Sequence, residues 1–127
     1  MERTENKKYT VAIIGASDKP DRYSYKALKL LKENNYEVIP INPVLEEIEG
    51  VKVYRSISII EKKIDTITLY INPDLLKRYI DEIIRIKPRR VIFNPGTESS
   101  EIEEIFEKSG IQTIEACTLV MLRTGQF

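Results

Sequence analysis

The sequence predicts an α/β fold with three layers, in which helices cover both faces of a doubly wound sheet of about five mainly parallel strands. Short apolar segments rich in β-branched residues alternate along the chain with segments whose apolar residues recur at helical spacing. Strands that are apolar on both faces are typical of parallel sheets, which need helices on each side. Because crossovers between parallel strands are right-handed, we expect an open, doubly wound sheet.

Length and composition limit the possible functions. The 127 residues fit a single domain, and 20 basic residues balance 20 acidic ones, which argues against nucleic acid as a partner. No apolar run suits a membrane span or a signal peptide, so we expect a cytoplasmic protein. The chain has no histidine and one cysteine, which argues against a metal site of the zinc type and excludes a Ser-His or Cys-His catalytic pair within it.

The first part of the chain is expected to begin with a strand over residues 9–14, which end in a run of apolar residues. A helix follows over residues 25–34, with leucines on its inner face, lysines outside and Ser24 as its N-cap. The next strand covers residues 37–41. Pro40 has no N–H to give to a sheet, so we expect this strand to deform there.

The middle of the chain has weaker patterns. Residues 51–54 are expected to form a short extended segment after an acidic connection, and residues 57–62 a short helix. The β-branched residues of 64–71 predict a strand. Pro73 is well placed to begin the next helix, whose apolar residues recur at helical spacing as far as residue 86.

The last part repeats the alternation. A strand is expected over residues 89–93, a helix over 100–109 and a final strand over 112–116. Cys117 stands among small and apolar residues and is expected to be buried and inert. The largely apolar residues 118–127 are expected to pack against the sheet.

The segment after the first strand has the features of an anion-binding site. Residues 15–17 are Gly-Ala-Ser and turn the chain tightly, and a polar loop then leads to the helix near Tyr25. Free N–H groups and the positive end of the helix dipole point at one place, where nucleotide pyrophosphates commonly bind. Lys19 and Arg22 in this loop could hold a further phosphate.

Three Asn-Pro pairs follow predicted strands: Asn42-Pro43, Asn72-Pro73 and Asn94-Pro95. In doubly wound sheets, ligands bind beyond the carboxyl ends of the strands, where the strand order reverses. We therefore expect these pairs to meet the first loop there. Proline rings would offer flat apolar surface to a base or a pantetheine chain, and asparagines would offer uncharged donors and acceptors.

The dinucleotide fingerprint G-x-G-x-x-G is only partly present. Gly15 occupies its first position, but Ser17 and Pro20 replace the later glycines. NAD sites usually also carry an acidic residue at the end of the second strand, whereas this strand ends Ile41-Asn-Pro43. NAD therefore ranks as the lesser ligand.

Five short motifs, taken together, resemble a known family: the small CoA-binding domain proteins, which are similar to the N-terminal domain of the succinyl-CoA synthetase alpha subunit. The resemblance covers nearly the whole chain. The motifs are Val11-Ala-Ile-Ile-Gly-Ala-Ser17 with Ser24-Tyr25, Tyr36-Glu-Val-Ile-Pro-Ile-Asn-Pro43, Gly50, Tyr70-Ile-Asn-Pro73 and Asn94-Pro-Gly96. The resemblance implies a Rossmann-like fold that holds coenzyme A through its ADP portion.

Carried over by position, the resemblance implies that residues 15–17 and the turn into Ser24 hold the pyrophosphate. Asn42 and Pro43 would border the nucleotide, and residues 71–73 would line the adenine or pantetheine side. The full set of expected ligand-binding residues is Gly15, Ala16, Ser17, Lys19, Arg22, Tyr23, Ser24, Asn42, Pro43, Ile71, Asn72, Pro73, Asn94, Pro95 and Gly96.

Two departures from the synthetase limit the function that is implied. Its lysine after the second strand meets the CoA phosphates, whereas the comparable stretch here, Val44-Leu-Glu-Glu47, has no base. Its second domain, whose histidine carries the phosphoryl group, has no counterpart in this sequence. We therefore expect a stand-alone module that binds CoA or an acyl-CoA without catalysis. The alternatives are an NAD(P)-binding redox or regulatory domain, a CoA-binding subunit of a larger enzyme, and a pure interaction scaffold whose cleft stays empty. A protein partner or a homo-oligomer is possible.

Many of the candidate residues also have a purely structural explanation. Gly15 could serve only close packing, and the two serines only a turn and a helix cap. Lys19 and Arg22 could be solvated loop charges. The asparagines at 42 and 72 could hydrogen-bond their own loops, and residues 94–97 could cap the following helix.

Overall fold

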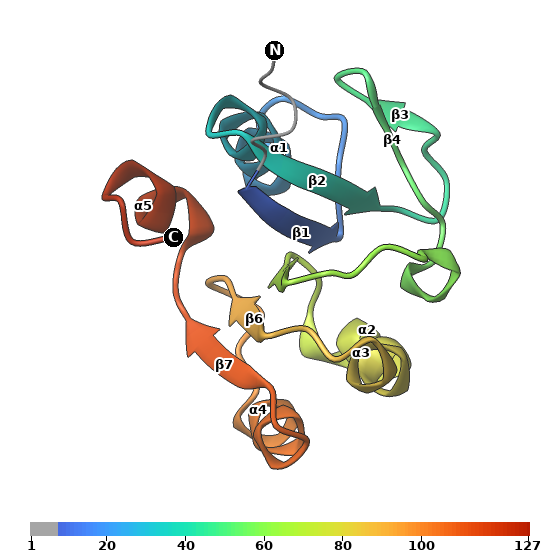
Figure 1. Ribbon diagram of the computed structural model, residues 1–127, viewed down its shortest axis with the longest axis vertical. Helices are drawn as coiled ribbons and strands as arrows, with labels where there is room; N and C mark the ends of the chain where they lie inside the picture. Colours follow the sequence, from blue (N-terminus) through green and yellow to red (C-terminus); the bar gives the residue numbers. More distant parts are fainter. Residues whose placement is uncertain (1–7) are drawn as a thin grey trace.

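A five-stranded parallel sheet forms the centre of the computed structural model, which describes residues 8–127 (Figure 1). The order is β2-β1-β5-β6-β7, and every neighbouring pair is parallel. The strands are β1 (Lys8–Ile14), β2 (Tyr36–Ile41), β5 (Thr66–Leu69), β6 (Arg90–Phe93) and β7 (Gln112–Glu115). The expected doubly wound sheet of five parallel strands is therefore confirmed.

Helices cover both faces of this sheet and give the fold its three layers (Figure 1). On one face, α1 (Tyr23–Glu33) contacts α5 (Thr118–Arg123). The other face carries two short 3-10 turns and three helices. They are η2 (Ile57–Ile59), α2 (Pro73–Leu76), η3 (Lys77–Tyr79), α3 (Ile80–Ile86) and α4 (Ser100–Lys108).

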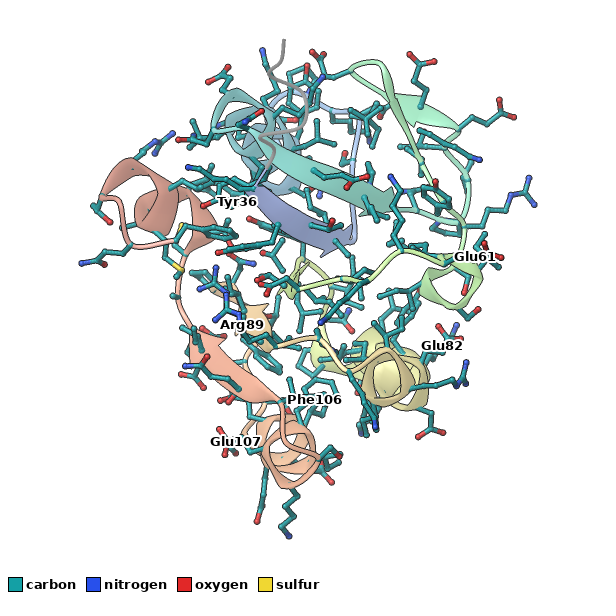
Figure 2. All side chains as sticks on the ribbon, viewed as in Figure 1. Tyr36, Glu61, Glu82, Arg89, Phe106 and Glu107 are labelled. Carbon is teal, nitrogen blue, oxygen red and sulfur yellow. The ribbon has the colours of Figure 1, made fainter. Side chains whose placement is uncertain are left out.

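Alternate residues of β1 contribute to two separate apolar cores. Val11 and Ile13 pack with the leucines of α1, whereas the residues next to them join the core on the opposite face. In that second core the rings of Phe93 and Phe106 lie 6.2 Å apart. Figure 2 shows Phe106 directed from α4 toward the sheet. Because β1 is buried on both faces, every position in its second half needs an apolar side chain.

β2 passes through Pro40 without the expected deformation. Pro40 stands opposite Ile13 in a register that runs without a shift from Thr10 to the end of β1. β2 lies at the edge of the sheet, where proline's missing N–H removes no ladder bond. The outward carbonyl oxygen of Pro40 accepts a hydrogen bond from the N–H of Tyr54 at 2.9 Å.

The acidic connection and the residues after it fold into a hairpin, of which the sequence patterns predicted only the second strand, as part of the extended segment over residues 51–54. Its strands, β3 (Glu47–Ile48) and β4 (Val51–Lys52), are antiparallel. The two residues between them, Glu49 and Gly50, have φ angles of 52° and 77°. A two-residue turn of this kind needs a positive φ angle at both positions, and a glutamate in the sequence does not indicate one.

Helix boundaries differ from the expectation at the start of α1 and around η3. α1 begins at Tyr23 and its N-cap is Arg22, so Ser24 lies inside the helix and is not its cap. The single helix expected over residues 73–86 is interrupted by η3. The apolar tail contains α5 and packs on the α1 side of the sheet, as its composition suggested. None of the helices within residues 8–127 is both long and apolar enough to cross a membrane.

Candidate functional site

The strand order reverses between β1 and β5. From β1 the chain passes through α1 to β2 on one side, and it later returns to β5 on the other side of β1. The loops that leave β1 and β5 therefore diverge at their carboxyl ends. In doubly wound sheets this switch point is where ligands bind.

Two clefts that share residues open at this switch point. The first cleft has a volume of about 600 Å³ and the second about 280 Å³, and both are lined by Gly15, Ser17, Arg22 and Ile71. The first is also lined by Ala16, Asp18, Lys19, Ile41, Asn42, Pro43, Val44, Leu45, Leu75, Arg78 and Tyr79. The second is also lined by Tyr23, Ser24, Tyr70, Asn72, Pro95, Gly96 and Thr97.

Backbone N–H groups without acceptors gather beside these clefts. The N–H groups of Gly15 and Ala16 both donate to the carbonyl oxygen of Ile41, at 3.3 and 3.1 Å, so neither is free to bind a ligand. The next two N–H groups, of Ser17 and Asp18, have no acceptor within residues 8–127. The N-cap of α1 makes no side-chain cap bond, so the helix start also presents open N–H groups. An anion is the natural acceptor for them.

Three cations line the first cleft: Lys19, Arg22 and Arg78. Asp18 is the one carboxylate among the residues that line the two clefts. In the described part of the chain, none of the three cations forms an ion pair within 4.0 Å. The first cleft therefore has a net positive lining that its own side chains do not neutralise.

Gly15 is required by packing, whatever binds nearby. Its φ angle is +94°, which favours glycine, and a Cβ atom there would lie 2.8 Å from the carbonyl oxygen of Tyr70 and 2.9 Å from Cγ2 of Ile71. The missing side chain thus lets the loop after β1 touch the loop after β5. This contact forms the floor that the two clefts share.

Two of the three Asn-Pro asparagines hydrogen-bond their own loops. Asn42 donates from Nδ2 to the carbonyl oxygen of Ala16 at 2.9 Å, and its Oδ1 accepts from the N–H groups of Val44 and Leu45. Asn72 caps α2, because its Oδ1 accepts from the N–H of Leu75 at 2.9 Å. Both residues still line a cleft.

Asn94 is a buried structural residue and lines neither of the first two clefts. It is 3% exposed, and its Nδ2 donates to the hydroxyl of Thr68 and the carbonyl oxygen of Leu69. Its Oδ1 accepts from the N–H of Thr118 at 2.9 Å, which fixes the start of α5 to the end of β6. The alternative that residues 94–97 cap the following helix is wrong, because Ser99 is the N-cap of α4. Pro73 begins α2 as expected and lies outside both clefts.

A third cleft of about 360 Å³ lies between the ends of β5 and β6 and the start of α5. Cys117 lines it and is half-buried, whereas full burial was expected. Burial raises the pKa of the Tyr70 phenol to about 12, so this residue keeps its proton at neutral pH. The lining residues are Tyr23, Tyr70, Asn94, Pro95, Cys117, Leu119, Val120 and Arg123.

The sequence patterns missed one wall of the first cleft. Leu75, Arg78 and Tyr79 come from α2 and η3, the helical segment after β5. Arg78 and Leu75 are exposed at the cleft and not turned inward. The available signal was a base and two large apolar residues in the first two turns after Asn72-Pro73, close to the carboxyl end of β5.

Comparisons with known proteins agree with this architecture. A curated Bacillus subtilis protein, YneT, is 28% identical over 100 residues, which cover 79% of this chain and 74% of that protein. The alpha subunit of ADP-forming acetate–CoA ligase II from Pyrococcus furiosus is 34% identical over 115 residues. A solved structure of an uncharacterized protein matches with a TM-score of 0.88 and 42% identity, over 93% of this chain and 97% of its own.

The ligase is a much longer protein. The match covers 82% of this chain but 25% of that subunit, so the chain spans about a quarter of its length. The family model described as a CoA binding domain matches residues 9–123, which include all of the sheet except Lys8, the residues that line the three clefts, and the whole of α5. The chain therefore belongs to the CoA-binding domain family.

Proposed function

We propose that this protein binds coenzyme A or an acyl-CoA through its ADP portion at the carboxyl ends of β1, β2 and β5, without catalysis by the chain alone. One observation carries the proposal: at the switch point of the sheet, open backbone N–H groups lie beside three cations that form no ion pair within residues 8–127. A cleft of about 600 Å³ is also within the usual range for a small-molecule site.

The phosphates are assigned to the part of the first cleft that the loop after β1 forms. The pyrophosphate accepts hydrogen bonds from the N–H groups of Ser17 and Asp18 and lies before the start of α1. Arg22 and Lys19 lie in the same loop and offer charge-assisted bonds to the remaining phosphate oxygens.

The adenine is assigned to the apolar side of the same cleft. Pro43 and Val44 line it from the β2 loop, and Leu75 and Tyr79 line it from the segment after β5. Val44 is 77% exposed and Leu75 is 37% exposed, so both offer apolar surface that a base could cover.

Arg78 is proposed to take the place of the lysine that the synthetase carries after its second strand. The loop after β2 has no base, but Arg78 lines the same cleft as that loop, from the segment after β5. A guanidinium group can bind a phosphate through two parallel hydrogen bonds. We assign Arg78 to the CoA phosphates in place of that lysine.

An NAD(P)-binding role has less support. A ribose diol in such a site is held by a carboxylate at the end of the second strand. Asn42 stands there, and its amide already bonds to Ala16, Val44 and Leu45. The position therefore has no carboxylate and little spare bonding capacity for a ribose.

A role as the CoA-binding part of a larger enzyme stays the second proposal. Both ADP-forming acetate–CoA ligases that match are longer than this chain, which covers 10% of the Methanocaldococcus jannaschii protein. The residues that line the first two clefts include neither histidine nor cysteine. Chemistry on a bound thioester would then need groups from a partner chain.

Ligand identity is tested on gently purified protein. Mass spectrometry of the molecules released on denaturation is expected to show CoA or an acyl-CoA. A thermal scan with excess CoA is expected to raise Tm, and NAD is expected to raise it much less, because only a ligand of the native state shifts unfolding. Equal shifts, or a larger shift with NAD, would contradict the proposal.

A further inference from the structure

The three clefts lie in a row along the carboxyl edge of the sheet, since neighbouring clefts share lining residues, and we call this row the path. The second cleft shares Gly15, Ser17, Arg22 and Ile71 with the first, and it shares Tyr23, Tyr70 and Pro95 with the third. A ligand whose phosphates lie in the first cleft can thus extend a flexible arm through the second into the third.

Charge and polarity change along this path. The first cleft holds three cations, whereas the third holds one, Arg123, on the exposed side of α5. Tyr23 and Val120 line the third cleft yet are 67% and 53% exposed. Together with Pro95 and Leu119, they give this cleft a mainly apolar lining, which suits an apolar occupant.

The floor of the third cleft offers little to a charged ligand. The side-chain amide of Asn94 already bonds to Thr68, Leu69 and Thr118. Tyr70 is a neutral phenol at physiological pH. The one cation at the rim is exposed, where water and salt screen its charge.

From this path we infer that the third cleft is an acyl subsite, which takes the uncharged short-chain acyl group of a CoA thioester. The inference rests on the proposed function, since the ADP portion must lie in the first cleft for the arm to reach the third. The protein would accordingly prefer a short aliphatic acyl-CoA to free CoA and to a thioester that ends in a carboxylate.

Calorimetric titration of the full chain with CoA, butyryl-CoA and succinyl-CoA tests this inference. Butyryl-CoA is expected to bind about tenfold more tightly than CoA, because burial of about two methylene groups has an effect of this size. Succinyl-CoA is expected to bind about as well as CoA. Equal affinity for all three would overturn the acyl subsite while leaving the CoA proposal intact, and binding of none of them would overturn the proposed function itself.

A variant pair places the effect in the third cleft. Val120→Glu puts a carboxylate into the cleft from an exposed helix position, and Gln126→Glu adds the same charge at an exposed position outside it. Val120→Glu is expected to abolish the tenfold preference for butyryl-CoA, and Gln126→Glu to preserve it. A preference that survives Val120→Glu would overturn the inference. So would a dimer that Val120→Glu dissociates, with ligand binding unchanged, because the cleft would then be a protein contact.

Discussion

Asn42 donates a hydrogen bond from Nδ2 to the carbonyl oxygen of Ala16 at 2.9 Å, and this bond joins the end of β2 to the loop after β1. The Oδ1 atom of the same side chain accepts from the N–H groups of Val44 and Leu45. One amide therefore fixes two walls of the first cleft. Both atoms of the amide are needed, because one must donate and the other accept.

Replacing this amide by a carboxylate is expected to disrupt the cleft. In Asn42→Asp the donor to Ala16 is lost, and a carboxylate oxygen faces the carbonyl oxygen instead. We expect about 2 kcal/mol less stability, within the range for a lost bond whose partner stays unpaired. CoA affinity is expected to fall about tenfold as well, since the new charge lies in the phosphate cleft. Urea unfolding and calorimetric titration measure the two effects.

Asn72→Asp is the matched control for stability. Among the described residues, Asn72 forms a hydrogen bond only through its Oδ1, which accepts from the N–H of Leu75 as the N-cap of α2, and aspartate caps helices equally well. Its free energy of unfolding is expected to stay within about 0.5 kcal/mol of the parent. Equal destabilisation by both variants would show that the bond between Asn42 and Ala16 has no special role.

Arg78→Gln tests the cation that the sequence patterns missed. It is expected to weaken CoA binding about tenfold without changing the free energy of unfolding, because the side chain is exposed and unpaired in the described structure. The salt dependence of CoA binding is expected to become shallower. Arg85→Gln removes a similar exposed charge from α3, outside the clefts, and is expected to bind CoA as the parent does. A parental affinity in Arg78→Gln would contradict the assignment.

The sequence predicted the sheet well because its signal is local. Short apolar runs such as residues 11–14, which Gly15 ends, are typical of strands buried on both faces, and the crossover rule then limits the architecture to a few arrangements. Boundaries were less predictable. The start of α1 at Tyr23 lacks a capping side chain, and η3 interrupts a continuous apolar pattern. Neither feature has a sequence signature.

The Asn-Pro pairs show why site residues were harder to predict than the fold. The same dipeptide yields a bond between loops at Asn42, a helix cap at Asn72 and a buried link to α5 at Asn94. Which of these bonds an asparagine forms depends on groups 3 to 26 residues away along the chain. The sequence does not indicate which of those groups lie next to the asparagine in the fold. The same holds for Arg78, which reaches the cleft only because β5 lies next to β1.

Stability is expected to fall as pH rises through the titration of Glu103. Desolvation, and then the neighbouring Glu115 carboxyl, raise the pKa of Glu103 to about 7. The folded state therefore binds this proton more tightly than the unfolded chain does. The contribution of this bound proton to stability is fully present below about pH 4.5, the ordinary pKa of a glutamate, and is lost as pH rises past 7.

Glu103→Gln removes this titration. The variant is expected to be about 1 kcal/mol more stable than the parent at pH 8 and no more stable at pH 4.5, a modest effect because water reaches the edge of the sheet. Unfolding at several pH values measures it. Glu104→Gln on the same helix removes an exposed carboxylate that pairs with Lys108 at 3.4 Å, and it is expected to show no gain at pH 8. A gain in Glu104→Gln as large as in Glu103→Gln would contradict the role of Glu115.

Gly15 and Gly96 form a natural pair for the final prediction, because their φ angles are +94° and +95° while their surroundings differ. A Cβ at Gly96 would meet nothing within 4 Å, whereas one at Gly15 would lie 2.8 Å from the backbone oxygen of Tyr70. Alanine at either position pays for the unfavourable φ, about 1–3 kcal/mol. Only Gly15→Ala must also push apart the loops after β1 and β5.

We therefore expect Gly15→Ala to lose about 2–3 kcal/mol more stability than Gly96→Ala, in the range of an overpacked contact. Urea unfolding of both variants without ligand measures the difference, since the contact does not depend on what the cleft holds. The same contact makes Gly15 variants unsuitable for testing whether a pyrophosphate touches this loop, because they move the floor of the cleft. Equal losses in the two variants would show that the loops can separate easily. The floor shared by the first two clefts would then be adjustable, and Gly15→Ala would become a valid probe of the ligand after all.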